Sequence, residues 1–417
     1  MNGEHKFKSV SANPTNPKWG KLIRRESGLY HRKNDIRSEF NRDYNRILHC
    51  NAYRRLKHKT QVFFATSNDH ICTRLEHVNH VSSVSYTISE YLGLNTELTT
   101  AIATGHDLGH TPFGHVGEHV LKDILDKEIN ITFWHEGNSL RFVDRYETLP
   151  DPEGNERNLN LTYAVRDGIV CHCGEVDENI LHPRDQYMDL YDIKDAGKYA
   201  PYTWEGCVVK ISDKISYLGR DIEDAMTLGI LNESQLDQLS FIIEKTLKTN
   251  LKYVLNNTVV MHEFIMDLCR ESSPDKGICI SSKYFDFMNA LKEFNYANIY
   301  KHERLKTYSK YAGLILHSIF DVLKKMYDSE NPLDPLLQNR GFYPTMISYF
   351  IDWLLKYSDL RERPDLPELY GEKMSKYKNH VIYYLPNKQD YIMAIADYIS
   401  GMTDSFAIKV FQELTDF

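Results

Sequence analysis

Residues Gly105-His-Asp-Leu-Gly-His-Thr-Pro-Phe-Gly-His115 form the most informative stretch of the chain. Three histidines and one aspartate fall within these eleven residues, next to segments that are otherwise apolar. Unpaired polar groups are costly in such surroundings, so these side chains are expected to have partners. On a helix, His106 and Asp107 share one cation only if it lies in the angle of about 100° between them. The stretch therefore predicts a metal site that takes further ligands from elsewhere in the chain.

A helix is predicted immediately before this stretch. Asn95 or Thr96 can cap its first turn, and an apolar stripe continues from there to Gly105. Because Pro112 disfavours helical geometry at the preceding residue, the helix is expected to end just past His110.

A second helix is predicted to begin near Gly114, and it places His115 and Glu118 on one face. A carboxylate beside an imidazole fixes its tautomer and raises its pKa, which suits proton transfer near neutral pH. The spacing alone, however, favours a surface pair at the start of a helix.

Two distant segments can complete the metal site. His77 shares the buried stripe of a predicted helix with residues that follow at steps of four, three and four: Val81, Val84 and Ile88. Residues 208–221 form another amphipathic helix, with Asp213, Tyr217 and Asp221 along its polar stripe. A single histidine among apolar residues is more often a core residue than a ligand, so His77 matters only in combination with the others.

Two imidazoles and two carboxylates are borderline donors. They suit Mn, Fe, Zn, Ni or Co, and also Mg where water completes the coordination shell. The sequence therefore predicts one divalent metal ion and leaves its identity open.

Segments of the chain, in this order, resemble those of a known superfamily. They are Arg74-Leu-Glu-His77, His106-Asp107 and Asp213-Lys-Ile-Ser-Tyr217, with further matches at 41–63, 134–141, 160–163 and 396–404. The chain resembles the HD-domain superfamily of metal-dependent phosphohydrolases. Within it, the chain is similar to the deoxyguanosine triphosphate triphosphohydrolase (dGTPase/dNTPase) family, including its SAM-and-HD-domain branch.

The resemblance implies a reaction and the residues that perform it. Water would attack the α-phosphorus of a deoxynucleoside triphosphate, giving the deoxynucleoside and tripolyphosphate. The implied metal ligands are His77, His106, Asp107 and Asp213. The implied catalytic residues are His115, which pairs with Glu118 and handles protons, and His110 and His135, which lie around the phosphates.

Substrate binding adds a charge requirement. The chain has 50 Lys and Arg against 58 Asp and Glu, a net charge of −8, so a polyanionic substrate needs local cations. Arg74 and Lys214 each adjoin a metal-binding segment and are expected to contact phosphate. By similarity, Gln61 and Asp221 would bind the 3′ hydroxyl, and Tyr217 would pack against the sugar. The preferred base stays open.

Helical periodicity dominates the 417 residues, and the fold is expected to be all-α: an HD-domain helical fold with additional C-terminal helices. We divide the chain into a basic N-terminal arm (1–39), an HD-type metallohydrolase core (40–235) and a C-terminal helical extension packed on the core (236–417). Residues 328–343 and 361–376, rich in Pro, Gly, Asn or charge, are predicted to be loops.

Compartment and partners follow from composition and from the resemblance. The odd number of cysteines, seven, does not suggest a disulfide framework, and a cytoplasmic location is expected. No apolar run reaches the roughly 18 residues that a membrane span needs. Cys171-His-Cys173 lacks a second ligand pair at suitable spacing and is interpreted as mostly structural. Family members commonly form hexamers or tetramers, so a homo-oligomer is expected.

The basic arm can touch single-stranded DNA, as in some relatives, although a mobile or subunit-bridging arm is favoured.

Two other functions compete with dNTP hydrolysis. One is an HD-type nucleotidase or phosphodiesterase acting on another nucleotide, and the other is an inactive nucleotide-binding or DNA-binding regulator.

Overall fold

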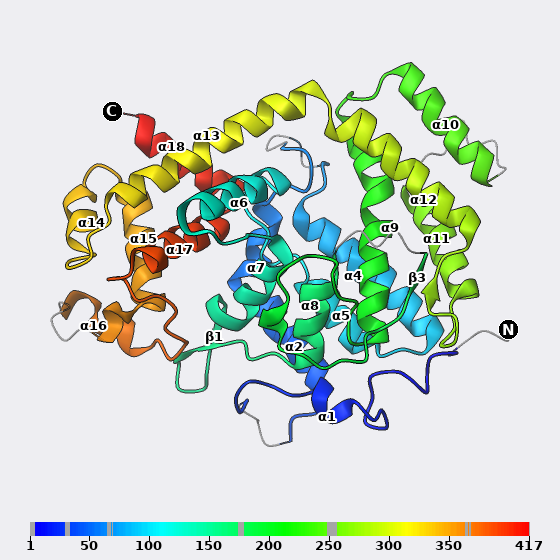
Figure 1. Ribbon diagram of the computed structural model, residues 1–417, viewed down its shortest axis with the longest axis horizontal. Helices are drawn as coiled ribbons and strands as arrows, with labels where there is room; N and C mark the ends of the chain where they lie inside the picture. Colours follow the sequence, from blue (N-terminus) through cyan, green and yellow to red (C-terminus); the bar gives the residue numbers. More distant parts are fainter. Residues whose placement is uncertain are drawn as a thin grey trace.

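The structure is a computed structural model that describes residues 5–29, 34–64, 68, 70–173, 179–247, 257–362, 366 and 368–416. Within these residues helices predominate, and the strands are confined to two short antiparallel pairs (Figure 1). The expected all-α fold is confirmed. The predicted arm at 1–39 includes residues 1–4 and 30–33, which lie outside the described residues.

The first half of the chain supplies the helices around the 105–115 stretch. They are α1 (Trp19–Leu22), α2 (Glu39–His49), α3 (Asn51–Arg55), α4 (Arg74–Leu92), α5 (Thr96–Gly105), α6 (His115–Ile129), α7 (His135–Arg141), α8 (Tyr163–Cys171) and α9 (Trp204–Thr227). Short helical turns lie between them: η1 (Leu56–His58), η2 (Phe142–Tyr146) and η3 (Leu190–Asp192). One hairpin pairs β1 (Thr148–Pro150) with β2 (Glu156–Asn158).

The second half adds a further set of helices. They are α10 (Glu233–Leu247), α11 (Asn257–Glu271), α12 (Ser282–Asn295), α13 (Glu303–Lys325), α14 (Asp334–Asn339), α15 (Pro344–Tyr357), α16 (Glu368–Ser375), α17 (Lys388–Ser400) and α18 (Asp404–Thr415). The short turns are η4 (Tyr296–Tyr300) and η5 (Asp359–Glu362). Strand β3 (Ile180–Leu181) pairs with β4 (Ile278–Cys279), so this sheet joins the two halves.

Two hydrophobic cores meet along α4 and α9. The first core joins α2, α5 and α8 to α15 and α17, whereas the second lies among α9, α10, α11 and α12. Along α4, Val81 belongs to the first core and Ile88 to the second. Burying each such side chain contributes roughly 1.5–3 kcal/mol, so both ends of α4 are firmly anchored. His77 and Asp213 lie on these two helices, at the seam between the cores.

Residues on both sides of position 235 contribute to each core. At the N-terminal end, Phe7 is fully buried and packs edge-on against Trp204, and the amide of Ala12 donates to the buried carboxylate of Glu205. The domain boundaries at residues 39 and 235 stay predictions.

The helix before the 105–115 stretch ends earlier than predicted. Of the two candidate caps, the side chain of Asn95 accepts a hydrogen bond from the amide of Leu98, but α5 stops at Gly105 and not past His110. The reason is tertiary: Gly109 donates through its amide to Ser139 Oγ (2.9 Å) and accepts from Asn138 Nδ2 (2.7 Å). A Cβ at Gly109 would lie 2.1 Å from the amide nitrogen of Ser139, so only glycine permits this approach.

Two predicted loops contain helices. α14 lies within 328–343, and α16 lies within 361–376, so these loop predictions were wrong over those residues. In α14, Pro335 occupies the first turn, where the fixed φ of proline favours a helix start. Among the described residues, no helix is both long enough and apolar enough to span a bilayer.

Candidate metal centre and active site

A cavity of about 530 Å³ lies beside the seam between the two cores. Its lining includes every predicted site residue except His106 and Glu118, which contact lining residues. The lining also includes aromatic residues from the second half of the chain: Tyr296, Tyr300 and Tyr308. The structure therefore brings the predicted residues together around one cavity.

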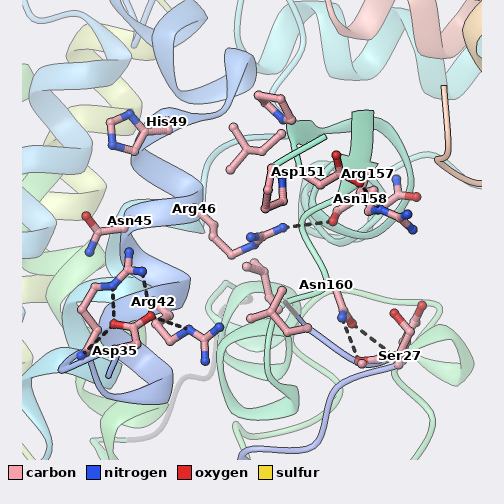
Figure 2. Close-up of a pocket in the computed structure, with 18 of the residues that line it drawn as sticks. Ser27, Asp35, Arg42, Asn45, Arg46, His49, Asp151, Arg157, Asn158 and Asn160 are labelled. Carbon is pink, nitrogen blue, oxygen red and sulfur yellow. Dashed lines mark hydrogen bonds and ion pairs between the residues drawn. The ribbon is translucent and has the colours of Figure 1, made fainter. Parts of the chain in front are cut away.

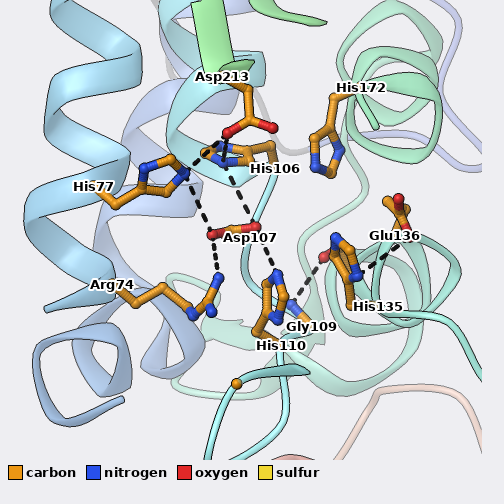
Figure 3. Close-up of polar contacts among 12 residues, drawn as sticks. Arg74, His77, His106, Asp107, Gly109, His110, His135, Glu136, His172 and Asp213 are labelled. Atoms are coloured by element: carbon orange, nitrogen blue, oxygen red, sulfur yellow. Dashed lines mark hydrogen bonds and ion pairs between the residues drawn. The ribbon is translucent and has the colours of Figure 1, made fainter. Parts of the chain in front are cut away.

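Four side chains converge from three segments of the chain, and we call them the His–Asp cluster: His77, His106, Asp107 and Asp213 (Figure 3). Nε2 of His77 lies 3.0 Å from Asp213 Oδ1 and 3.9 Å from Asp107 Oδ2. Nε2 of His106 lies 3.6 Å from Asp107 Oδ1 and 3.9 Å from Asp213 Oδ1. Each imidazole thus presents a nitrogen to the same two carboxylates.

Local sequence explains how these side chains are positioned. A capping box fixes the start of α4, because Thr73 Oγ1 accepts from the Glu76 amide and Glu76 Oε2 accepts from the Thr73 amide. Arg74 and His77 are thereby held in the first turn of α4. Thr203 caps α9 in a similar way and fixes the helix that carries Asp213.

The His–Asp cluster fits a divalent cation. Nδ1 of His106 lies 2.6 Å from the carbonyl of Ala103, which makes Nδ1 the donor and leaves a lone pair on Nε2. That Nε2 is buried and has no hydrogen-bond partner among the described residues. Such an orphaned nitrogen facing two carboxylates is a cost that a bound cation removes. With two imidazoles and two carboxylates, the donor set suits a borderline divalent ion.

Basic neighbours keep Asp107 ionised. Its Oδ2 lies 2.7 Å from Arg74 Nη1, and its Oδ1 lies 3.1 Å from His110 Nε2. Burial would raise the pKa of Asp107, but His110, His106 and Arg74 hold it well below its ordinary value. Arg74, predicted to contact phosphate, is thus also a partner that orients this carboxylate.

A second group, which we call the His–Glu cluster, contains His115, Glu118 and His135. His115 Nδ1 lies 3.1 Å from Glu118 Oε2, and His135 Nδ1 lies 3.1 Å from both oxygens of the same carboxylate. Burial would raise the pKa of Glu118, but hydrogen bonds to the two histidines keep it well below its usual value. The side chain of His115 is 66% exposed, so it can reach a ligand in the cavity.

His110 links the two clusters. Its ring stacks on that of His135 with centroids 3.9 Å apart, while its Nε2 contacts Asp107. Burial first, and then the charge of Arg74, lowers the pKa of His110 well below its ordinary value. The ring of His110 therefore joins Asp107 of one cluster to His135 of the other.

The predicted sugar-binding residues lie farther along the same cavity. Asp221 is buried two turns after Asp213 on α9, and burial raises its pKa to about 7, although a hydrogen bond from the Tyr300 hydroxyl opposes the shift. Oε1 of Gln61 is buried with no partner among the described residues. Lys214 and Tyr217 line the cavity beside them.

Sequence reasoning missed how several residues support the site, and Lys59, considered there as a phosphate contact or a solvated charge, is one of them. Lys59 is buried, and its ammonium donates to the carbonyls of His110 and Ser400. Asp404 accepts hydrogen bonds from the amides of Thr60 (2.9 Å) and Phe113 (2.8 Å). The sequence signal was that both lie in segments that resemble those of the dGTPase family. His172, which follows α8, also faces the cluster (Figure 3).

A larger cavity, of about 720 Å³, lies apart from these clusters, between α2 and the β1–β2 hairpin (Figure 2). Many of its charges already have partners: Arg157 bonds to Asp151, Arg166 to Asp144, and Arg46 to the Leu159 carbonyl. Its lining contains neither the His–Asp nor the His–Glu cluster.

Residues 74–218 match the HD domain family, a range that holds the whole His–Asp cluster and the whole His–Glu cluster. Similar proteins include three deoxyguanosinetriphosphate triphosphohydrolase-like proteins. The one from Caldanaerobacter subterraneus subsp. tengcongensis is 31% identical, with 92% of this chain and 86% of that protein covered. The one from Desulfatibacillum aliphaticivorans is 37% identical over 70% of this chain and 76% of the relative. The one from Clostridium tetani is 31% identical over 92% of this chain and 87% of that protein.

Proposed function

Because the chain belongs to the deoxyguanosinetriphosphate triphosphohydrolase-like family of HD-domain proteins, we propose that it hydrolyses deoxynucleoside triphosphates to deoxynucleoside and tripolyphosphate. The observation that carries this proposal is the His–Asp cluster, with its orphaned His106 nitrogen, at one wall of a cavity that also holds the His–Glu cluster. The cavity's volume falls in the usual range for small-molecule sites.

In the proposed reaction, a water oxygen bonds to the α-phosphorus and the bond from that phosphorus to the 5′ oxygen breaks. His77, His106, Asp107 and Asp213 would hold one divalent ion. When bound, this ion supplies positive charge that offsets the charge developing on the α-phosphate, and it helps to orient or acidify water. Its identity is left open among Mn, Mg, Fe, Ni, Co and Zn.

The chain's own residues perform the remaining steps. His115 donates through Nδ1 to Glu118, so its Nε2 is free to take a proton from the attacking water or to return one to the leaving 5′ oxygen. Glu118 stabilises the imidazolium that forms. The rings of His110 and His135 stack on each other, and they would lie against the phosphates.

Cationic side chains compensate for the negative charge of the whole chain. Lys214 and Arg74 line the cavity and would contact the triphosphate. Gln61 and Asp221 would bind the 3′ hydroxyl. The buried, unpartnered Oε1 of Gln61 supports this role, because it offers an acceptor that a hydroxyl can satisfy. Tyr217 would pack against the deoxyribose.

The proposal is tested by product analysis. Purified full-length chain is incubated with each dNTP, singly and mixed, with Mg²⁺ or Mn²⁺ in water enriched in heavy oxygen. Tripolyphosphate and deoxynucleoside should appear in equal amounts, with the heavy oxygen in the tripolyphosphate. Turnover only in mixtures would indicate activation by a second nucleotide.

Other outcomes favour the competing functions. Orthophosphate or pyrophosphate as the product would support an HD-type nucleotidase or phosphodiesterase. A metal-loaded chain that binds nucleotides without turnover would support a regulator.

The proposal also includes a tetrameric or hexameric assembly, which light scattering tests. It further includes binding of single-stranded DNA by the basic arm, which is tested by measuring how the affinity depends on salt.

A further inference from the structure

A second set of metal-ligating side chains lies beside the His–Asp cluster. His135, His172 and Cys173 each place one ligand atom within 4.8 Å of the others, and we call them the His–Cys cluster. All three line the 530 Å³ cavity. Figure 3 shows His172 and His135 across the site from His77. The sequence offered Cys171-His-Cys173 no second ligand pair, and the fold brings His135 from another helix to it.

His172 is positioned in the same way as His106. Nδ1 of His172 lies 2.7 Å from the carbonyl of Ile169, three residues earlier, as Nδ1 of His106 lies 2.6 Å from that of Ala103. Both histidines follow the last residue of a helix, and their ring centroids are 4.8 Å apart. In both, Nδ1 is the donor, so Nε2 keeps the lone pair that a metal requires.

His135 presents the same ring nitrogen for a different reason. Its Nδ1 lies 3.1 Å from both oxygens of Glu118, which leaves Nε2 as its ligand atom. A carboxylate that accepts from the far nitrogen of a metal-bound imidazole is the usual second partner of such a ligand. Both imidazoles of the His–Cys cluster are therefore orientated by groups on the side away from the proposed ion.

The third member is a thiol held in place by its main chain. The ammonium of Lys210, buried on α9, donates to the carbonyl of Cys173 (2.5 Å) and to that of Cys171 (3.4 Å). The Cys173 thiol forms a hydrogen bond with His135. A proton shared between a thiol and an imidazole occupies the place that a cation takes once the thiol ionises.

We propose that His135, His172 and Cys173 bind a second divalent cation of borderline-soft character, such as Zn²⁺ or Co²⁺, beside the ion of the His–Asp cluster. Two imidazoles and one thiolate are ligands that such ions favour, and three protein ligands leave a coordination position for water or a phosphate oxygen. On binding, the S–H bond of Cys173 breaks, sulfur keeps the electron pair and bonds to the ion, and the proton leaves to solvent.

Asp107 connects the two sites. Its carboxylate has an oxygen within 4.8 Å of ligand atoms on both His106 and His172. Two adjacent dications repel each other, and a carboxylate between them offsets part of this repulsion. The second site does not depend on dNTP hydrolysis, because it rests on protein ligands alone.

The test is a titration of chelator-treated, full-length protein with Co²⁺, followed by optical absorption and by metal analysis after dialysis. The wild-type chain should bind two ions and develop the near-ultraviolet charge-transfer band of a cobalt–thiolate bond. Cys173→Ser and His172→Asn should each lose this band and bind one ion fewer. Cys171→Ser is the matched control, because the sulfur of Cys171 lies 3.6 Å from Arg184 Nη1. This variant should keep the band and both ions.

His77→Ala separates the two sites. This variant should lose the ion of the His–Asp cluster and retain the thiolate band. Loss of the band in His77→Ala would assign the thiolate to the first ion and overturn the proposal, as would a single ion per wild-type chain or an unchanged band in Cys173→Ser. The wild-type measurement decides the matter even if a variant fails to fold, and circular dichroism identifies such variants.

Discussion

The His–Asp cluster and the His–Glu cluster share a cavity but differ in how their polar atoms are satisfied. In the His–Asp cluster, a buried nitrogen of His106 faces two carboxylates and has no hydrogen-bond partner among the described residues. In the His–Glu cluster, Glu118 accepts from both histidines, and one of these, His115, reaches solvent.

The difference indicates two kinds of chemistry. A buried polar atom without a hydrogen-bond partner is satisfied when a cation binds to it. This distinguishes a cation site from a hydrogen-bond network that is already complete. A carboxylate–imidazole pair that is complete in itself and partly exposed can exchange protons with a ligand. The His–Asp cluster should therefore support no turnover without its ion. A change in the His–Glu cluster should remove only the part of the rate that acid–base catalysis contributes.

The largest effect is expected from His106→Ala or Asp213→Ala. Removing either ligand should abolish the site for the ion, and turnover of dNTPs should fall by about 10³-fold or more, since metal catalysis supplies several kcal/mol. Steady-state kinetics and metal analysis of the same samples check this. Normal activity in a variant that had lost the ion would contradict the assigned mechanism.

His115→Ala should keep the ion and lower kcat by about 10²- to 10⁴-fold, the usual contribution of a positioned acid–base group. Because this side chain is 66% exposed, added imidazole should restore part of the rate. Lys122→Ala, an exposed change on the same helix, serves as control. If His115→Ala lost the ion as well, the two clusters would not be separable.

Asp404→Ala tests how much the site depends on support from α18. The amides of Thr60 and Phe113 would lose their acceptor, and such losses cost about 1–3 kcal/mol each when the amides are buried. Urea unfolding should show a loss of about 2–4 kcal/mol, and activity should fall about tenfold. The exposed Asp416→Ala should leave both unchanged.

The smallest effect concerns Asp221, which shares α9 with Asp213 but has its pKa shifted the opposite way. The pKa of Asp221 is raised to about 7, so this residue is increasingly ionised as the pH rises past that value. The carboxylate repels a triphosphate, whereas the neutral acid does not, so KM should rise about two- to fivefold between pH 6 and 8. Asp221→Asn should remove this rise. An identical pH profile in the variant would exclude Asp221 as its source.

Much of this arrangement could be predicted from local patterns. The apolar steps after His77 placed it on the buried face of α4, and Asn95 was one of the two predicted caps, because both signals lie within about three helical turns. The end of α5 was predicted wrongly because it depends on Ser139 and Asn138 of another helix, which no local pattern reveals.

The supporting residues were missed for the same reason. Lys59 and Asp404 act on carbonyls and amides of distant segments, and main-chain groups leave no signature in a sequence. The roles predicted for Gln61, Lys214 and Tyr217 remain predictions, although the structure places all three in the cavity.

The hydrogen bond between Asp404 and the amide of Phe113 spans 291 residues. Phe113 and Gly114 both have positive φ angles (64° and 59°), which are unfavourable for a phenylalanine, and the bond from Asp404 stabilises this turn. A ribosome that has just made the 105–115 stretch must still add every residue up to Asp404 before that bond can form. A nascent chain therefore carries the whole His–Asp cluster before this turn receives its stabilising bond.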